Sequence, residues 1–253
     1  SYTSMGNYFL LRGSYDKAID YFNQVLDIRL KLYLPNHPNI AICYDNLAKS
    51  YLAKKQFDKA IEFHQKALAI RIPVFGTEHL GVAFSYLGLG NVYFEQQRPD
   101  SAVYCFTKAL AIREKVHGSQ HPFVANLLIN LGNVFLANRD FQAADSLFQR
   151  ALSIQLKKLG ATHQEVAATW LALGQSAQQQ GRLSDAAEDI LKAAAAVRYT
   201  EGNDFSKVSN LSLLEKALYH TAQLHLKKYN ITREDDEVVQ AAGYADQAIN
   251  ALQ

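Results

Sequence analysis

Several residue types return every 42 positions along most of this chain. Alanine, histidine and a small residue that follows leucine or methionine each form such a column. The alanine column is Ala18, Ala60, Ala102, Ala144 and Ala186, the histidine column is His37, His79, His121 and His163, and the small-residue column is Gly6, Ala48, Gly90, Gly132 and Gly174. Because independent columns at a single period do not arise by chance, the sequence predicts a series of similar units that stack on one another.

Each unit has the hydrophobic pattern of two amphipathic helices. In the second unit, residues 41–55 (AICYDNLAKSYLAKK) and residues 57–75 (FDKAIEFHQKALAIRIPVF) both place apolar side chains at i, i+3, i+4 and i+7. Glycine follows the second helix in three units, at positions 76, 118 and 160, where helices commonly end. The pattern therefore predicts an all-α fold built from helix pairs.

The motif inside the units resembles the tetratricopeptide repeat (TPR). The third unit has the spacing Y-x2-L-G-x2-Y…A-x3-F at Tyr86, Leu89, Gly90, Tyr93, Ala102 and Phe106. The 42-residue length and a connector of the form G-x2-H-P-x-V-A are similar to kinesin light chains and many bacterial repeat proteins. The resemblance implies a right-handed TPR superhelix, an α-solenoid of stacked antiparallel helix pairs.

The register divides the chain into two regions. Residues 1–198 hold five units, the first of them truncated at its start, and the columns lapse after Arg198. Residues 199–253 still contain two amphipathic segments, 211–229 and 235–252. We expect these to form a divergent terminal pair that caps the solenoid or leads to a missing domain.

The same terminal region is similar to the junction found in bacterial CHAT proteins, in which TPRs precede a caspase-like peptidase domain. The resemblance is carried by LSLLEKALYHTAQLHLKKY and VVQAAGYADQAINALQ. It implies that the chain is part of a larger bacterial signalling or regulatory protein, with a protease domain after residue 253.

Composition argues against several classes of partner and location. The formal net charge is +2 and the basic residues are spread along the chain, so no stripe suited to nucleic acid is visible. No stretch reaches the about 18 to 20 apolar residues that span a membrane. Two cysteines are too few for a disulfide framework and fit a reducing, cytoplasmic setting.

The residues that suggest chemistry have simpler interpretations. Stacked helices lie about 10 Å apart, whereas metal–nitrogen bonds are about 2 Å long, so successive histidines of the column cannot share an ion. We expect these histidines to bond backbone groups between units, and His64, which interrupts an apolar column, to be packed or partly exposed. Cys43 and Cys105 fall in small or apolar columns, which indicates packing. The sequence predicts no enzyme, no cofactor and no metal.

One polar column on the first helices has no such structural explanation. It reads Asn7, Lys49, Asn91, Asn133 and Gln175. Asparagine has poor helix propensity, and at these positions it has no capping role. In related TPRs the first helices line the concave surface, and the matching residue grips the backbone of a bound peptide. Because an amide both donates and accepts hydrogen bonds, it suits a peptide unit.

Two apolar columns run beside the amides. The first is Leu87, Ile129 and Leu171, and the second includes Leu52, Phe94 and Leu136. They could form pockets for ligand side chains. Alternatively, the amides bridge neighbouring first helices and the apolar residues belong partly to the core between units.

These columns lead to a functional prediction. We expect a non-enzymatic module that binds a protein or peptide segment in the concave groove. The alternative is a regulatory scaffold whose groove is occupied by its own chain or complex, controlling the adjacent CHAT-type protease domain.

Overall fold

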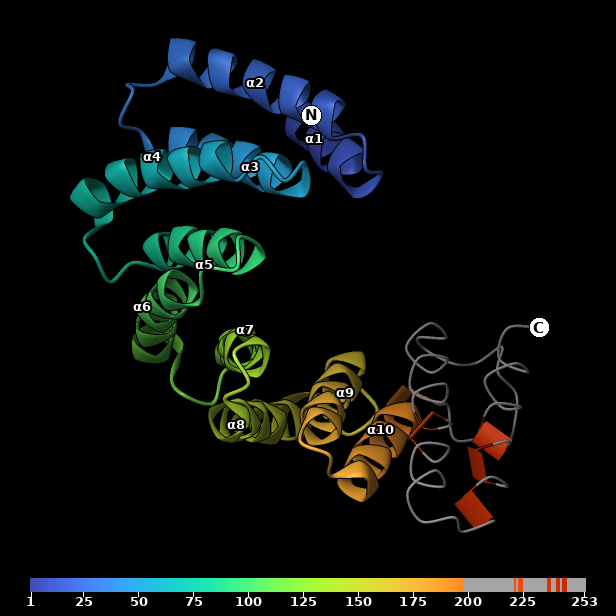
Figure 1. The fold of residues 1–253 in the computed structure, drawn as a ribbon. Coiled ribbons are helices and arrows are strands. Elements are labelled where there is room, and N and C mark those ends of the chain that lie inside the picture. Colours follow the sequence, from blue (N-terminus) through green and yellow to red (C-terminus); the bar gives the residue numbers. More distant parts are fainter. Residues whose placement is uncertain (198–220, 222, 225–235, 238–239, 242, 245–253) are drawn as a thin grey trace. The chain divides into compact units, whose positions relative to one another are not determined.

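A computed structural model describes residues 1–197 and, beyond them, residues 221, 223–224, 236–237, 240–241 and 243–244. The described helices fall into first and second members of pairs (Figure 1). The first helices are α1 (Tyr2–Leu11), α3 (Pro38–Ala53), α5 (Leu80–Glu95), α7 (Pro122–Ala137) and α9 (Gln164–Gln179). The second helices are α2 (Tyr15–Leu32), α4 (Phe57–Phe75), α6 (Pro99–His117), α8 (Phe141–Leu159) and α10 (Leu183–Val197).

The predicted all-α class is confirmed, since the described part of the chain has helices and no strand. The predicted helix at 57–75 matches α4, and the one at 41–55 corresponds to α3, which begins earlier because His37 and Pro38 start it. The predicted terminal helices at 211–229 and 235–252 lie largely outside the described residues, so the predicted terminal pair stays a prediction.

The chain divides into two compact units, Ser1–Ser119 with α1 to α6 and Gln120–Gln253 with α7 to α10. In both units each first helix packs against the second helix that follows it. Consecutive pairs then join through α2 with α3 and α4 with α5 in the first unit, and through α8 with α9 in the second. First helices of successive pairs also touch, α3 with α5 and α7 with α9.

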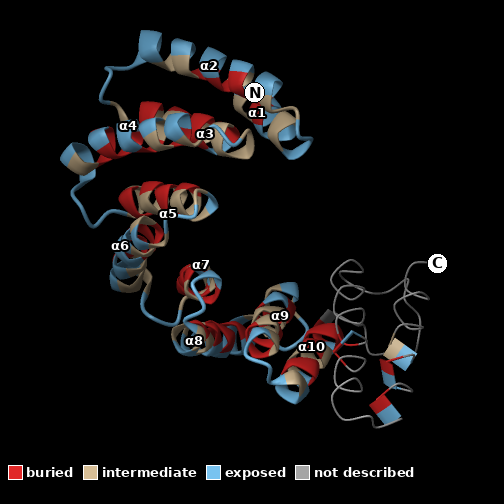
Figure 2. Ribbon diagram, viewed as in Figure 1, coloured by how far each residue is buried: buried red, intermediate tan, exposed pale blue. Residues whose placement is uncertain are grey.

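Each pair is closed by a small residue on the first helix that faces a large side chain on the second. A Cβ on residue 90 would lie 2.5 Å from the Phe106 ring, so glycine lets the two helices approach closely. The glycines at 6, 132 and 174 face Phe22, Phe148 and Ile190 in the same way. The buried residues form a stripe along each helix that faces its partners (Figure 2). The predicted packing role of Gly90 is confirmed.

A polar contact joins consecutive pairs near the end of the second helix. Arg71 Nη1 donates to Ser85 Oγ, and Thr169 Oγ1 donates to Gln155 Oε1 over 2.7 Å. At the first junction, Arg29 Nη1 donates to the carbonyl oxygen of Asn39 and lies 3.4 Å from the sulfur of Cys43. These contacts satisfy polar groups that the stacking of pairs would otherwise bury unpaired.

The turn inside each pair requires a left-handed backbone. One residue in each turn has a positive φ: Gly13 (73°), Lys55 (58°), Gln97 (57°), Arg139 (61°) and Gly181 (77°). A side chain at such a position costs free energy because its Cβ crowds the following carbonyl. The middle turns therefore carry strain that the glycine turns avoid.

We expect Arg139→Gly to raise the free energy of unfolding by about 0.5–1 kcal/mol, because relief of strain outweighs the extra freedom of glycine in the unfolded chain. Urea unfolding would measure it. The matched control is Gly181→Ala, where a new Cβ would meet no heavy atom within 4 Å, so the backbone alone accounts for an expected loss of about 1 kcal/mol. A loss of stability in Arg139→Gly would contradict this explanation.

Candidate functional site

The histidine column caps the first helices. Nδ1 of His37, His79, His121 and His163 accepts a hydrogen bond from the backbone N–H two residues on, at 3.1, 3.0, 3.2 and 3.2 Å. Such a bond satisfies a donor that the start of a helix leaves without a partner. The predicted structural role is confirmed. In the part of the chain that the structure describes, no three metal-binding side chains gather in one place.

We expect His163→Ala to lower the free energy of unfolding by about 1 kcal/mol, because the N–H of Glu165 loses its acceptor. His163→Asn should retain most of the stability, because asparagine is among the best helix-capping residues. Thermal unfolding of the three proteins would measure this. Equal losses in both variants would show that the ring stabilises the junction by packing and not by capping.

Both cysteines are buried thiols in packed positions. Cys43 and Cys105 are 2% and 3% exposed. Burial raises the pKa of Cys105 to about 11, and it raises the pKa of Cys43 against the opposing effect of the Arg29 guanidinium. A thiol held protonated and enclosed is a poor nucleophile, which agrees with the packing role inferred for both residues.

Among the residues that the structure describes, one cluster resembles catalytic machinery, a buried polar network in the first unit. Nδ1 of His64 lies 2.8 Å from Oδ1 of Asp45, and Arg71 forms an ion pair with Oδ2 of the same carboxylate. Ser85 Oγ donates to Oδ1 of Asp45 over 3.2 Å. His64 is fully buried and Asp45 is 1% exposed, so no substrate can reach them. The network is a structural substitute for apolar packing.

The network replaces residues that the other units keep apolar or aromatic. Phe22, Phe106 and Phe148 fill the column of His64, and Leu87 follows Asp45 in its own column. A Cβ on Gly88 would lie 2.2 Å from Cε1 of His64, so glycine is needed there to admit the imidazole.

We expect Asp45→Ala to cost about 3–5 kcal/mol of unfolding free energy, because Arg71 and His64 would remain buried without their shared carboxylate. Lys54→Ala, which breaks an ion pair with the exposed Asp16, should cost at most about 1 kcal/mol. Urea unfolding of both variants would compare the two pairs. Similar losses would mean that burial adds nothing to the first pair.

The amide column lies on the first helices in both units. In the first unit Asn7 and Lys49 are exposed and Asn91 is half-buried; in the second Asn133 and Gln175 are half-buried. Among the described residues, no hydrogen bond links the side-chain amides of Asn7, Asn91, Asn133 or Gln175 to another group. The alternative in which these amides bridge neighbouring first helices therefore has no support in these contacts.

The apolar columns share a helix face with the amides. Leu87, Asn91 and Phe94 follow one another at i, i+4 and i+7 on α5, which places them on one stripe. Leu87, Ile129, Leu171, Leu52 and Phe94 are half-buried. Leu136 is 8% exposed and packs in the core with Phe148, so it offers little surface to a ligand, and Ile129 and Leu171 also pack partly against buried clusters.

Lys49 gives this face its cation. Its ammonium lies 4.4 Å from the centre of the Phe84 ring, so a side chain of α3 reaches across to α5. Desolvation lowers the pKa of Lys49, and the nearby Asp45 carboxylate partly opposes that effect. The ammonium of the exposed Lys49 thus lies over an aromatic ring of the next first helix.

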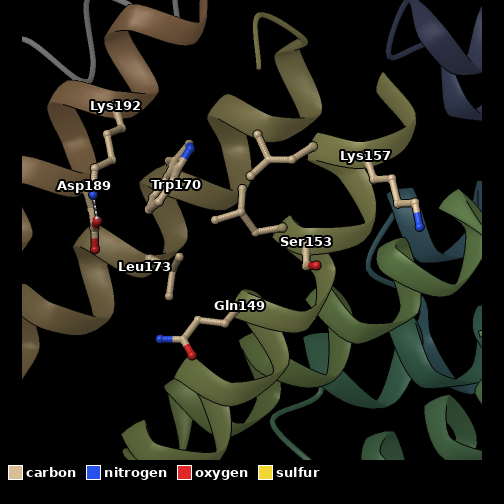
Figure 3. Close-up of a pocket in the computed structure, with 9 residues that line it drawn as sticks. Gln149, Ser153, Lys157, Trp170, Leu173, Asp189 and Lys192 are labelled. Atoms are coloured by element: carbon tan, nitrogen blue, oxygen red, sulfur yellow. Dashed lines mark hydrogen bonds and ion pairs between the residues drawn. The ribbon is translucent and has the colours of Figure 1, made fainter. Parts of the chain in front are cut away.

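A hollow that the sequence analysis did not predict lies among α8, α9 and α10 (Figure 3). Its volume is ≈ 770 Å³. Trp170 and Leu173 of α9 form the floor, α8 contributes one side, and Asp189 and Lys192 of α10 form the other. One signal was available in the sequence, because Asp189 stands in a column that otherwise holds Tyr21, Phe63, Cys105 and Leu147.

The α10 side of this hollow is internally paired. The Lys192 ammonium lies 2.8 Å from Glu188 and 3.4 Å from Asp189, and 4.5 Å from the centre of the Trp170 ring. Burial raises the pKa of Asp189 against the opposing effect of Lys192. This wall therefore offers no unpaired cation, since two carboxylates share its one ammonium.

In the described part of the chain, no helix has the length and apolar character needed to cross a bilayer.

The stacked helix pairs, their fixed period and their glycine-to-ring contacts define an all-α repeat protein. The tetratricopeptide repeat family model matches residues 1–72, 47–115, 82–157 and 123–198. The chain belongs to the TPR family. TPR arrays are scaffolds that bind protein or peptide partners and are typically non-catalytic, and this chain fits that class.

Solved structures show the same fold. A kinesin light chain-type protein of Podosopora anserina with nearly identical TPR-like repeats has a TM-score of 0.66 at 25% identity, over 78% of this chain and 93% of that one. BtubC (BKLC) from P. vanneervenii has a TM-score of 0.72 at 19% identity, over 96% and 90%. Aspartyl phosphate phosphatase F from Bacillus subtilis has a TM-score of 0.68 at 16% identity, over 100% and 69%.

The identities of the last two structures are low, so they support the fold alone. No curated protein matches the sequence.

Proposed function

We propose that the first-helix face carrying the amide column binds an extended or helical peptide segment of a protein partner. The observation that carries the proposal is that the amides of Asn91, Asn133 and Gln175 lack hydrogen-bond partners among the residues that the structure describes. They are half-buried, and no protein group within the described residues satisfies their side-chain amides. Asparagine is a poor helix former, so the fold gains nothing from it at these positions.

A peptide backbone is the ligand that matches this chemistry. A side-chain amide can accept from a peptide N–H and donate to a peptide carbonyl at once, and each such bond adds about 1 kcal/mol net. The half-buried Leu87 and Phe94 lie on the same stripe as Asn91 and would take up ligand side chains. Backbone gripping by amides and side-chain selection by apolar neighbours together support a peptide-binding role.

The test is to recover a partner with the immobilised chain and to measure its affinity for variants. We expect Asn91→Ala and Asn133→Ala each to weaken binding about fivefold per lost hydrogen bond, with a melting temperature that is equal or slightly higher, because alanine is the better helix former. Calorimetric titration would give the affinities, and thermal unfolding the stabilities.

Asn23→Ala is the matched control, because Asn23 is an exposed amide on the second helix α2. It should leave the affinity unchanged. Wild-type affinity in both column variants would refute the gripping role. A fall in melting temperature equal to the fall in affinity would assign the amides to stability.

A second function rests on the resemblance of the terminal region to CHAT proteins. In it, the module belongs to a larger bacterial cytoplasmic protein, and its groove holds part of its own chain or complex to control a protease domain after residue 253. The segment that carries this resemblance lies largely outside the described residues. Reading the sequence that follows residue 253 would test it: a caspase-like αβ pattern with separated histidine and cysteine supports it, and any other domain refutes it.

A further inference from the structure

The hollow around Trp170 lies among the second helices α8 and α10 and the first helix α9, on residues that are separate from the amide column (Figure 3). We propose that it is a second binding site, which takes a large apolar side chain of a partner polypeptide together with an aspartate or glutamate about one helical turn away. The apolar group would rest on Trp170, and the carboxylate would pair with Lys157.

The apolar part of the site is the surface formed by Trp170, Leu152, Leu156 and Leu173. Leu156 is 39% exposed and Trp170 is half-buried, so a ligand can contact both. A volume of ≈ 770 Å³ exceeds that of one side chain, so the hollow can admit an aromatic or branched residue with part of its backbone. Tryptophan offers a wide rigid surface to such a group.

The charge that a ligand must carry depends on which charged side chains of the site already have partners. Asp189 and Glu188 hold Lys192 on the α10 side. On the α8 side, Gln149, Ser153 and Lys157 form a row at i, i+4 and i+8 (Figure 3). Among the described residues, the Lys157 ammonium has no carboxylate partner, so a ligand that supplies one carboxylate complements this side.

The spacing comes from the same row. Lys157 lies one helical turn, or about 6 Å, further along α8 than Ser153, and both residues line the hollow (Figure 3). The side chain of Lys157 extends away from Trp170, so the carboxylate must lie outside the apolar contact. A helical or extended segment with an apolar residue and an acidic residue within four positions meets this condition.

The first unit offers a natural comparison at the equivalent place. There α4 and α6 flank α5, and the hollow has a volume of ≈ 430 Å³. Tyr93 and Tyr104 narrow it where the second unit has Ala177 and Glu188. The position of Lys157 is held by Pro73, which brings no charge. Of these two hollows, the one around Trp170 has the larger volume, and only it has a lysine at this position.

The test is a selection from a random library of about twelve-residue peptides displayed on phage. Peptides that bind the wild-type chain are kept, and those that also bind the Ser153→Phe variant are removed. The new ring would add bulk to the α8 side of the hollow, which Ser153 lines. Because Ser153 is exposed on α8, this change should not disturb the core, and thermal unfolding would verify it. Trp170 is the sole tryptophan, so its fluorescence reports occupancy of the site directly.

We expect the surviving peptides to share a large apolar residue with Asp or Glu within four positions. Ser153→Phe should weaken their binding at least about tenfold, and Lys157→Gln about three- to tenfold, as expected for loss of a charge-assisted contact. The matched controls are Ala69→Phe, the equivalent exposed position in the first unit, and Lys158→Gln, the adjacent exposed lysine. Both should bind as the wild type does.

Three outcomes would overturn the proposal. In the first, no selected peptide binds both Ser153→Phe and Leu156→Gln, a change at the rim of the hollow, more weakly than it binds the wild type. The selected peptides could lack acidic residues and be indifferent to Lys157→Gln. Their binding could also leave Trp170 fluorescence unchanged. Peptides that respond to Asn91→Ala and not to Ser153→Phe would support the proposed first-helix site and refute this one, so the two proposals fail separately.

Discussion

The distance between the two helices of a pair is set where a glycine on the first helix meets a large side chain on the second, which is a phenylalanine in three pairs and Ile190 in the pair of α9 and α10. With a Cβ at position 90 or 132, the helices could not approach the buried phenylalanine that faces them. Such contact fixes the closeness of the pair, and the closeness in turn decides which side chains lie between pairs and which remain at the surface. Stacking then buries apolar side chains between consecutive pairs, such as Phe22 with Leu47, and adds a polar contact such as that of Arg71 with Ser85. The binding surfaces are a consequence of this regular spacing.

That spacing underlies both of the binding surfaces that we propose. The first helices display amides that form no side-chain hydrogen bond among the described residues, and apolar side chains lie beside them. Where second helices run side by side over a first helix, they leave a hollow whose character depends on a few side chains. In one unit tyrosines narrow it, and in the other Trp170 lines it beside a lysine. A scaffold of this kind can hold two segments of one partner, and simultaneous engagement would raise the effective affinity without any new contact.

Much of the fold could be predicted because a repeat is read several times over. The period, the helix pairs, the glycine contacts and the capping histidines all follow from residues that recur in columns. The hollow at Trp170 could not be assembled from such columns, since it depends on how far Gln149 and Lys192 stand apart after folding. The network at Asp45 and His64 was likewise missed as a network. In the sequence, both features coincide with an aspartate, Asp45 or Asp189, in a column whose other members are mostly apolar. A charged residue that departs from its repeat column can therefore indicate a polar network or a surface hollow.

The network of Asp45, His64, Arg71 and Ser85 also bears on how such a chain can evolve. Asp45, His64 and Arg71 belong to one 42-residue module, whereas Ser85 and the glycine that admits the imidazole belong to the next. A duplication, deletion or exchange of either module alone would separate these residues, and each buried charge or polar group would then lack its partner. The two modules are therefore not interchangeable with the others, and an exchange at this boundary would destabilise the chain unless both modules moved together.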